Sequence, residues 1–178
     1  MSGRAQGLLL RVYRRLPTLG RRWVVRTIAP SYTVGAMCFI ERPDGALLLV
    51  RHLYRRRWGV PGGLLERGER PEEAACREVW EEVHLRVRLL GEPAVVVDAL
   101  PQRVDIIYRA EPADDADLDA VGPGSPEIVE ARWFPRNELP ELQHETASAL
   151  VALARSSRSP QALPVDAPLA AAEHRRPR

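Results

Sequence analysis

The chain of 178 residues contains no lysine, only two cysteines and no long apolar run. Its 26 basic residues are therefore all arginines, and with 24 acidic residues they leave a net charge of +2, which gives no reason to expect a polyanionic partner. Cys38 and Cys76 lack the paired spacing of a zinc site or a disulfide framework. The apolar run 47–50 is far too short to cross a bilayer. Disulfide scaffolds, zinc knuckles and membrane-spanning proteins are therefore disfavoured.

What is present fits one globular domain with an appendage at each end. Apolar residues make up 45% of the chain and charged residues 28%, an ordinary balance for one domain. Residues 1–30 form a basic amphipathic extension, residues 31–155 carry the domain, and residues 156–178 form a Pro- and Ala-rich tail that we expect to be disordered. The extension is expected to pack as a helix on the domain or at a dimer contact. Association with a membrane is the less favoured alternative. Arginines directly follow the first leucines, the wrong order for a secretory signal, so we expect a cytoplasmic protein.

The middle segment alternates between strand-like and helix-like patterns. Pro43-Asp44-Gly45 has turn chemistry and predicts a hairpin between the first two strands. Residues 58–63 contain too much glycine and proline for a helix interior, and an acidic loop covers residues 111–126. Strands around a central helix, with helices toward both ends, predict a mixed-sheet α/β (α+β) layer structure. We predict strands over residues 32–40, 46–51, 87–90, 94–99, 104–110 and 128–134, and helices over residues 71–83 and 145–155.

The helix over residues 71–83 carries a concentration of glutamates. Residues three and four apart share a helix face, so Glu78, Glu81 and Glu82 lie together, while alanine and valine residues face the core. The bland interpretation is a solvated charged face. However, no lysine follows at four-residue spacing, and carboxylates gathered without counter-charges suit a hard divalent cation such as Mg²⁺. Arg70 is a poor N-cap, which predicts a helix start shifted by a residue or two.

The spacing around this helix resembles the Nudix signature, G-x5-E-x7-R-E-U-x-E-E-x-G-U, in which U is aliphatic. Gly63 is followed after five residues by Glu69 and after seven more by Arg77–Leu85. Every fixed position matches except the late glycine, which is His84. The preceding residues 58–63 (WGVPGG) are also similar to the approach to this box. With the flanking strand pattern included, the likeness covers the whole middle segment.

The resemblance implies an α/β/α sandwich with a loop–helix–loop motif that hydrolyses a nucleoside diphosphate linked to another group. Glu78, Glu81 and Glu82 would bind the metal, Mg²⁺ or Mn²⁺, with the carbonyl of Gly62 as a further ligand. Arg77 would orient these carboxylates through charge-assisted bonds, and the first glutamate of the signature would brace the motif. Glu78 or Glu82 would accept the proton of the attacking water, and the residues alone do not choose between them.

Candidates outside the box come with plain alternatives. Glu127, at the entrance to the last strand, is the candidate for an extra metal ligand or base, although acidic loop residues are most often merely solvated. Arg51, Trp58 and Glu130 are candidates for substrate binding, because arginine can hold phosphate and aromatic faces stack on bases. Tyr54 could stack in the same way. An exposed basic loop and core packing are the competing interpretations.

The three histidines of the middle segment are interpreted as structural. A glycine just past a helix end usually takes the left-handed conformation, so His84 is expected there at a cost of roughly 1–2 kcal/mol and without a chemical role. His52 and His144 have no partner spacing that would indicate a metal or catalytic site.

The signal for the substrate is weaker than the signal for the class. Pro101 stands sixteen residues after Leu85, a spacing that the family associates with ADP-ribose pyrophosphatases, so ADP-ribose or a nucleotide sugar is the leading expectation. The alternatives are a nucleoside triphosphate pyrophosphohydrolase that cleans the nucleotide pool, a non-catalytic nucleotide-sensing module, and an adaptor that works through residues 1–30. The expected partner is a small nucleotide, with no nucleic acid and no membrane, and a homodimer is left open.

Overall fold

The computed structural model describes Pro17 and residues 31–156, and its centre is a four-stranded sheet. The strands are β1 (Thr33–Ile40), β3 (Gly62–Leu64), β4 (Val87–Asp98) and β5 (Arg103–Pro112). They lie in the order β3-β1-β5-β4, with β1 parallel to β5 and the other neighbours antiparallel, so the sheet is mixed as predicted. The predictions for the N-terminal extension and the C-terminal tail lie outside the described residues.

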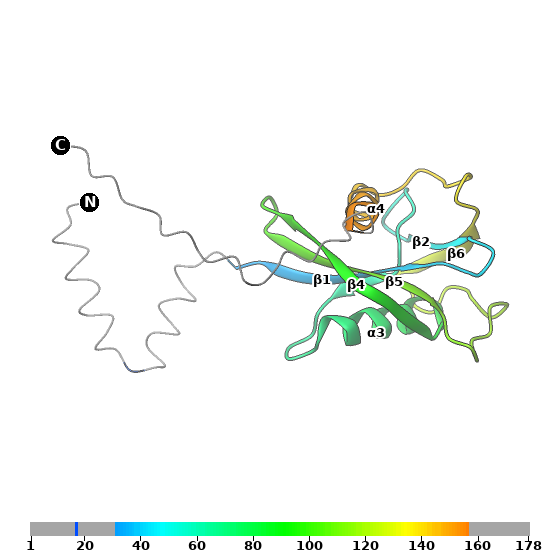
Figure 1. Ribbon diagram of the computed structural model, residues 1–178, viewed down its shortest axis with the longest axis horizontal. Helices are drawn as coiled ribbons and strands as arrows, with labels where there is room; N and C mark the ends of the chain where they lie inside the picture. Colours follow the sequence, from blue (N-terminus) through cyan, green and yellow to red (C-terminus); the bar gives the residue numbers. More distant parts are fainter. Residues whose placement is uncertain (1–16, 18–30, 157–178) are drawn as a thin grey trace.

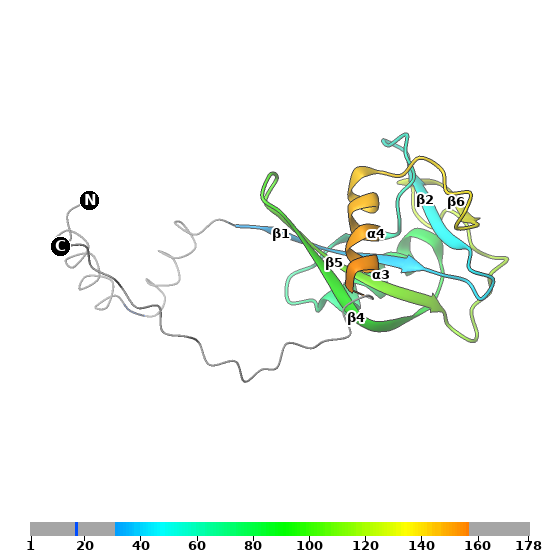
Figure 2. The same cartoon turned by 45° about the horizontal axis from the view of Figure 1, so that its top comes forward.

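Two helices cover opposite faces of this sheet, α3 (Pro71–Val83) on one and α4 (His144–Ser156) on the other (Figure 1, Figure 2). A second, two-stranded sheet pairs β2 (Leu47–His52) with β6 (Ile128–Phe134). One apolar core lies on the α3 side and a second on the α4 side. This arrangement confirms the predicted α/β/α sandwich. Neither helix of residues 31–156 has the length and hydropathy needed to cross a bilayer.

β1 is the strand on which both cores are built. Successive side chains of a strand point to opposite faces, so Ala36, Cys38 and Ile40 enter the α3 core while Met37 and Phe39 enter the α4 core. Because both faces are covered, the strand is a continuous apolar run without polar alternation. This central strand holds the short β3, and through it the start of the glutamate-bearing motif, at a fixed place on the sheet.

The predicted hairpin between the first two strands is wrong. The turn itself forms, because the N–H of Gly45 bonds to the carbonyl of Arg42 and the N–H of Arg42 bonds to the carbonyl of Ala46. Beyond one bridge between Glu41 and Leu47, however, β1 and β2 enter different sheets. Turn residues determine the local reversal of the chain, whereas burial of the two strand faces decides which partners each strand takes.

Two further strand predictions need correction. β4 is one strand where two were predicted, and its register against β5 shifts between Leu90 and Ala94, with Gly91 at a φ of 62°. Such a β-bulge bends a strand without ending it. β3 lies where a loop was predicted, because three residues that include two glycines show no apolar pattern.

The start of α3 also differs from expectation. The helix begins at Pro71 without a shift, because the Glu73 carboxylate accepts the backbone N–H of Arg70 at 3.1 Å. Arg70 was expected to be a poor N-cap residue. Its backbone N–H is nevertheless hydrogen-bonded, by a side chain of the first helical turn. Cys38 and Cys76 are both free thiols, in agreement with the sequence interpretation.

Candidate active site

Arg77, on α3, gathers the acidic side chains of the motif. Its Nε and Nη2 donate to the two oxygens of Glu69 at 2.8 and 3.0 Å, and its Nη1 donates to Glu78 at 2.9 Å and to Glu81 at 3.1 Å. A bond from Nη2 to the carbonyl of Leu64, at 3.2 Å, ties the group to β3. The expectation that the carboxylates lack counter-charges is therefore wrong for Glu78 and Glu81. An arginine that precedes them on the helix takes the place of the missing lysines.

Negative charge nevertheless exceeds positive charge in this cluster. Hydrogen bonds with Glu69 raise the pKa of the Arg77 guanidinium, and the same bonds lower the pKa of the Glu69 carboxyl. Burial raises the pKa of Glu78 above its ordinary value; Arg77 opposes this rise, and repulsion from Glu82 and Glu81 adds to it. A cation placed beside Glu78 would relieve both the burial cost and the repulsion.

Two glycines let the carboxylates lie against the sheet. A Cβ on Gly63 would sit 2.3 Å from Oε1 of Glu78, closer than any non-bonded contact allows. A Cβ on Gly62 would sit 2.3 Å from the carbonyl oxygen of Ala36 on β1. Gly62 is therefore required for β3 to pair with β1, and Gly63 leaves the room that the Glu78 carboxylate occupies against β3.

Glu82 is the most enclosed carboxylate of the helix, with 8% of its surface exposed. Its Oε2 accepts the backbone N–H of Gly62 at 3.3 Å, and its Oε1 lies 3.4 Å from Nε2 of His52 on β2. The sequence interpretation treated His52 as structural, because the residues are far apart in the chain and no motif joins them. The structure brings the histidine into the site.

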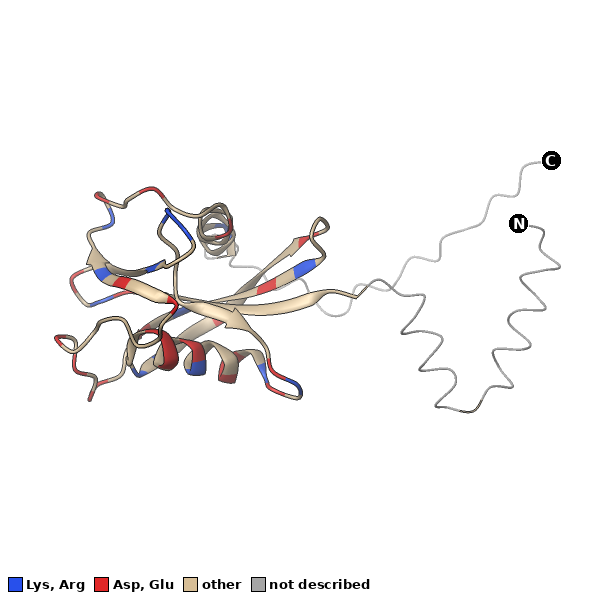
Figure 3. Cartoon of the chain, turned by 180° about the vertical axis from the view of Figure 1, so that it is seen from behind, with Lys and Arg blue, Asp and Glu red and all other residues tan. Residues whose placement is uncertain are grey.

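The three glutamates face a cavity of about 520 Å³. Figure 3 shows acidic residues concentrated along α3. Arg55 and Arg103 also line the cavity; Arg55 pairs with Glu145 at 3.1 Å, and Nε of Arg103 donates to the buried Asp105 at 2.8 Å. Tyr54, 68% exposed, is the aromatic side chain of the lining. The cavity therefore combines carboxylates with two arginines and an aromatic ring, and sequence reasoning had not assigned Arg103 to the site.

Glu127, which was predicted to be a site residue, lines the same cavity. Its loop is fixed to the exit of α3, because the N–H of Gly124 donates to the carbonyl of Glu82 at 2.7 Å. A Cβ on Gly124 would lie 2.7 Å from the carbonyl oxygen of Glu81, so a glycine is needed at this contact. The acidic loop thus contacts the end of α3 at Gly124 and reaches the cavity at Glu127. Whether Glu127 binds metal stays a prediction.

Arg51, Trp58 and Glu130, the predicted substrate-binding residues, meet each other outside this cavity. Arg51 and Glu130 are register partners on β2 and β6, joined by an ion pair of 2.9 Å, and the guanidinium lies 5.9 Å from the Trp58 ring centre. Trp58 packs edge-on against Phe134 in the α4 core. None of the three is among the cavity-lining residues of the described chain, so their role in binding stays a prediction without a geometric link to the carboxylates.

The carboxylates of Glu78, Glu81 and Glu82 are suitable ligands for a hard cation, although their oxygens are not arranged around a single point. In the described part of the chain, no three acidic, histidine or cysteine side chains converge on one point as metal ligands. Oxygens of Glu78 and Glu81 are turned to one nitrogen of Arg77, within 3.1 Å. The helix fixes where each glutamate begins, so rotation of these side chains would offer carboxylate oxygens, the ligands that Mg²⁺ prefers, to the same cavity.

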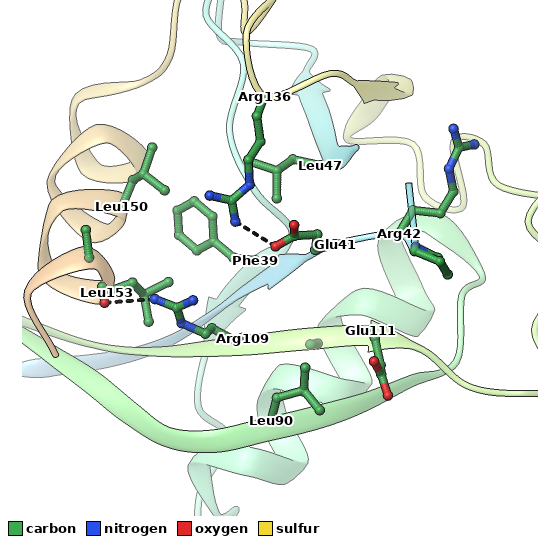
Figure 4. Close-up of a pocket in the computed structure, with 13 residues that line it drawn as sticks. Phe39, Glu41, Arg42, Leu47, Leu90, Arg109, Glu111, Arg136, Leu150 and Leu153 are labelled. Atoms are coloured by element: carbon green, nitrogen blue, oxygen red, sulfur yellow. Dashed lines mark hydrogen bonds and ion pairs between the residues drawn. The ribbon is translucent and has the colours of Figure 1, made fainter. Parts of the chain in front are cut away.

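A second cavity, of about 350 Å³, lies between α4 and the far end of the sheet (Figure 4). Apolar side chains such as Phe39 form its wall, and its charged groups are already engaged. Arg136 bonds to Glu41 at 2.6 Å, and Arg109 bonds to the carbonyl of Leu153 at 2.9 Å. This cavity contains no glutamate of the box, and we do not assign the chemistry to it.

The helix exit confirms the conformation expected of His84. Its φ and ψ are 55° and 31°, in the left-handed region, and its N–H donates to the carbonyl of Trp80 at 2.9 Å. The ring stacks edge-on against that of Trp80, with centres 5.5 Å apart.

Replacing His84 with Gly should leave kcat/KM unchanged. Relief of left-handed strain, roughly 1–2 kcal/mol, is offset by loss of the ring contact, about 0.5–1.5 kcal/mol, so the unfolding temperature should move little. Steady-state kinetics and thermal unfolding check both statements. A loss of turnover in a variant of unchanged stability would instead assign His84 a chemical role.

The sandwich and its acidic cavity fit a hydrolase of pyrophosphate bonds, and comparison with known proteins identifies the family. The NUDIX domain model matches residues 31–153. A MutT-like protein of Streptomyces ambofaciens is 30% identical over 119 residues, 67% of this chain and 74% of that protein. A Mycobacterium tuberculosis protein provisionally named 8-oxo-dGTP diphosphatase 3 is 34% identical over 170 residues, 82% of this chain and 78% of that protein. The chain belongs to the Nudix hydrolase family.

Solved structures show the same fold. A NUDIX hydrolase from Nitrosomonas europaea matches with a TM-score of 0.62 and 27% identity, covering 74% of this chain and 76% of that chain. An ADP-ribose pyrophosphatase from Streptococcus suis matches with a TM-score of 0.58 and 23% identity, covering 74% and 96%. At that identity the second likeness supports the fold alone.

Proposed function

We propose that this chain hydrolyses the pyrophosphate bond of a nucleotide with Mg²⁺ or Mn²⁺ held by Glu78, Glu81 and Glu82. The carbonyl of Gly62 and the carboxylate of Glu127 would complete the ligand set. The observation that carries the proposal is the crowding of carboxylates around one guanidinium, that of Arg77, beside a cavity large enough for a nucleotide phosphate chain.

Each group has a task in this chemistry. The bound cation would neutralise the phosphate chain and lower the pKa of a coordinated water. Glu78 or Glu82 would accept the proton of the attacking water, because both carboxylates line the cavity. Arg55 and Arg103 face the cavity and would bind phosphate oxygens, and Tyr54 would stack on the base.

Two substrate classes compete for this cavity. The expectation of ADP-ribose or a nucleotide sugar rested on Pro101. In the structure Gln102, the next residue, has a φ of 62°, and Pro is favoured directly before such a position in a turn. Turn geometry thus accounts for Pro101 without reference to a substrate. The relative named as an 8-oxo-dGTP diphosphatase, similar over 82% of this chain, favours the alternative, a nucleoside triphosphate. We therefore place triphosphates first.

A substrate panel tests the proposal. Purified full-length protein with Mg²⁺ is offered nucleoside triphosphates, 8-oxo-dGTP, ADP-ribose, nucleotide sugars and dinucleotides, and products are separated by chromatography. Cleavage to a nucleoside monophosphate that stops on chelation of the metal is the expected result. Preference for triphosphates supports the first class and preference for ADP-ribose supports the second. No turnover of any nucleotide would contradict the proposal and favour a sensing module.

A further inference from the structure

A buried amide at the start of α4 lies beside His52, the residue that approaches Glu82. Gln143 precedes α4 and has 9% of its surface exposed. Its side-chain Nε2 lies 3.1 Å from the carbonyl oxygen of Arg57 and 3.5 Å from Nδ1 of His52. A Cβ on Gly59 would lie 2.9 Å from the same nitrogen, so the glycine there gives the amide its room. The amide is thus inserted between backbone and imidazole at a defined place.

The carbonyl of Arg57 determines which way this amide points. A carbonyl only accepts hydrogen bonds, so the amide of Gln143 must present its NH₂ and not its oxygen. One hydrogen of that NH₂ serves Arg57, and the other points to Nδ1 of His52. In a neutral imidazole that accepts this bond at Nδ1, the ring hydrogen is on Nε2. That nitrogen lies 3.4 Å from Oε1 of Glu82.

We infer that His52 is a positioning residue for the carboxylate of Glu82, with its tautomer fixed by Gln143. The N–H of His52 holds one oxygen of Glu82, and the backbone N–H of Gly62 holds the other at 3.3 Å. Each carboxylate oxygen keeps a further lone pair for a cation. The inference deepens the proposed function, because it assigns to the same site a support that comes from β2 and the entrance of α4.

Three substitutions test the inference through the dependence of turnover on Mg²⁺. His52→Asn shortens the side chain and removes the donor to Glu82, and Gln143→Leu leaves the tautomer unfixed. Both should raise the Mg²⁺ concentration for half-maximal activity by about ten- to a hundredfold, the usual effect of losing a partner that orients a metal ligand. His52→Gln keeps an N–H at nearly the position of Nε2 and should restore most of the affinity.

The control is His144→Gln, because His144 is exposed, adjacent to Gln143 and outside the cavity lining. Its Mg²⁺ dependence should equal that of the wild type, and unfolding temperatures are measured for all variants. Equal Mg²⁺ dependence in His52→Asn and the wild type, or no rescue by His52→Gln, would overturn the inference.

A readout independent of turnover is the tautomer itself, observed by ¹⁵N NMR of the histidine rings in the metal-free full chain. We expect the Nε2–H form of His52 in the wild type and a mixture of tautomers in Gln143→Leu. The Nδ1–H form in the wild type would contradict the inference even if nucleotides are hydrolysed. If the expected tautomer is found in a protein without hydrolytic activity, the proposed function fails. The inferred hydrogen bonds from Gln143 to His52 and from His52 to Glu82 are then still supported.

Discussion

Replacing Glu82 with Gln is expected to reduce kcat/KM for the best nucleotide by about 10²–10⁴-fold, the usual range for loss of a group that takes part in proton transfer or metal-assisted attack. The amide has the shape of the carboxylate and can still accept the N–H of Gly62, so the fold should persist. What is lost is one negative charge, that of the most enclosed carboxylate of α3.

Glu72→Gln is the matched control for this experiment. Glu72 lies on the same helix, pairs with Arg70 and is not among the residues that line the cavity. Kinetics of both variants are compared at saturating Mg²⁺, together with thermal unfolding. Full activity of Glu82→Gln would show that this carboxylate takes no part in the reaction. An equal loss in Glu72→Gln would show that the acidic residues act only by general charge. Either result would make the assignment of the site wrong.

Gly63→Ala should be almost as damaging, although it adds only one methyl group. The new Cβ would lie only 2.3 Å from Oε1 of Glu78, so the carboxylate must move away from β3. A displacement of about 1 Å at a reacting group can cost on the order of 10²-fold in rate. We expect a loss of that size in kcat.

Gly122→Ala serves as the comparison, because a Cβ at Gly122 meets no atom within 4 Å and the residue lies in the loop that leads to the site. It should retain wild-type kinetics. Unfolding temperatures separate a displaced carboxylate from a damaged fold. Wild-type kcat in a folded Gly63→Ala protein would show that the position of Glu78 does not matter to the reaction.

The sequence was most informative where local rules decide the structure. The separation of the glutamates of α3 from its core residues follows from helical spacing, which acts over four residues. The left-handed exit at His84 follows from the steric preference of a helix end. The four acidic positions and the arginine of the motif needed only their spacing to be recognised.

Contacts between distant segments could not be derived in the same way. His52 and Gln143 are 91 residues apart, and nothing in either neighbourhood indicates that β2 and the entrance of α4 meet. Arg51 and Glu130 face each other only because β2 pairs with β6, whereas turn chemistry had predicted β1 as the partner of β2. Strand partners depend on the burial of whole faces, so these residues were assigned without their true neighbours.

Direct measurement of cation binding tests the central claim most closely. Electron paramagnetic resonance follows free Mn²⁺ as full-length protein is added, with a non-hydrolysable nucleotide present. The account predicts saturable binding by the wild type and by Glu72→Gln, and a large loss of binding in Glu78→Gln and Glu82→Gln. Equal binding by all four proteins, or no binding by any, would contradict the claim that the carboxylates of α3 hold a divalent cation for hydrolysis.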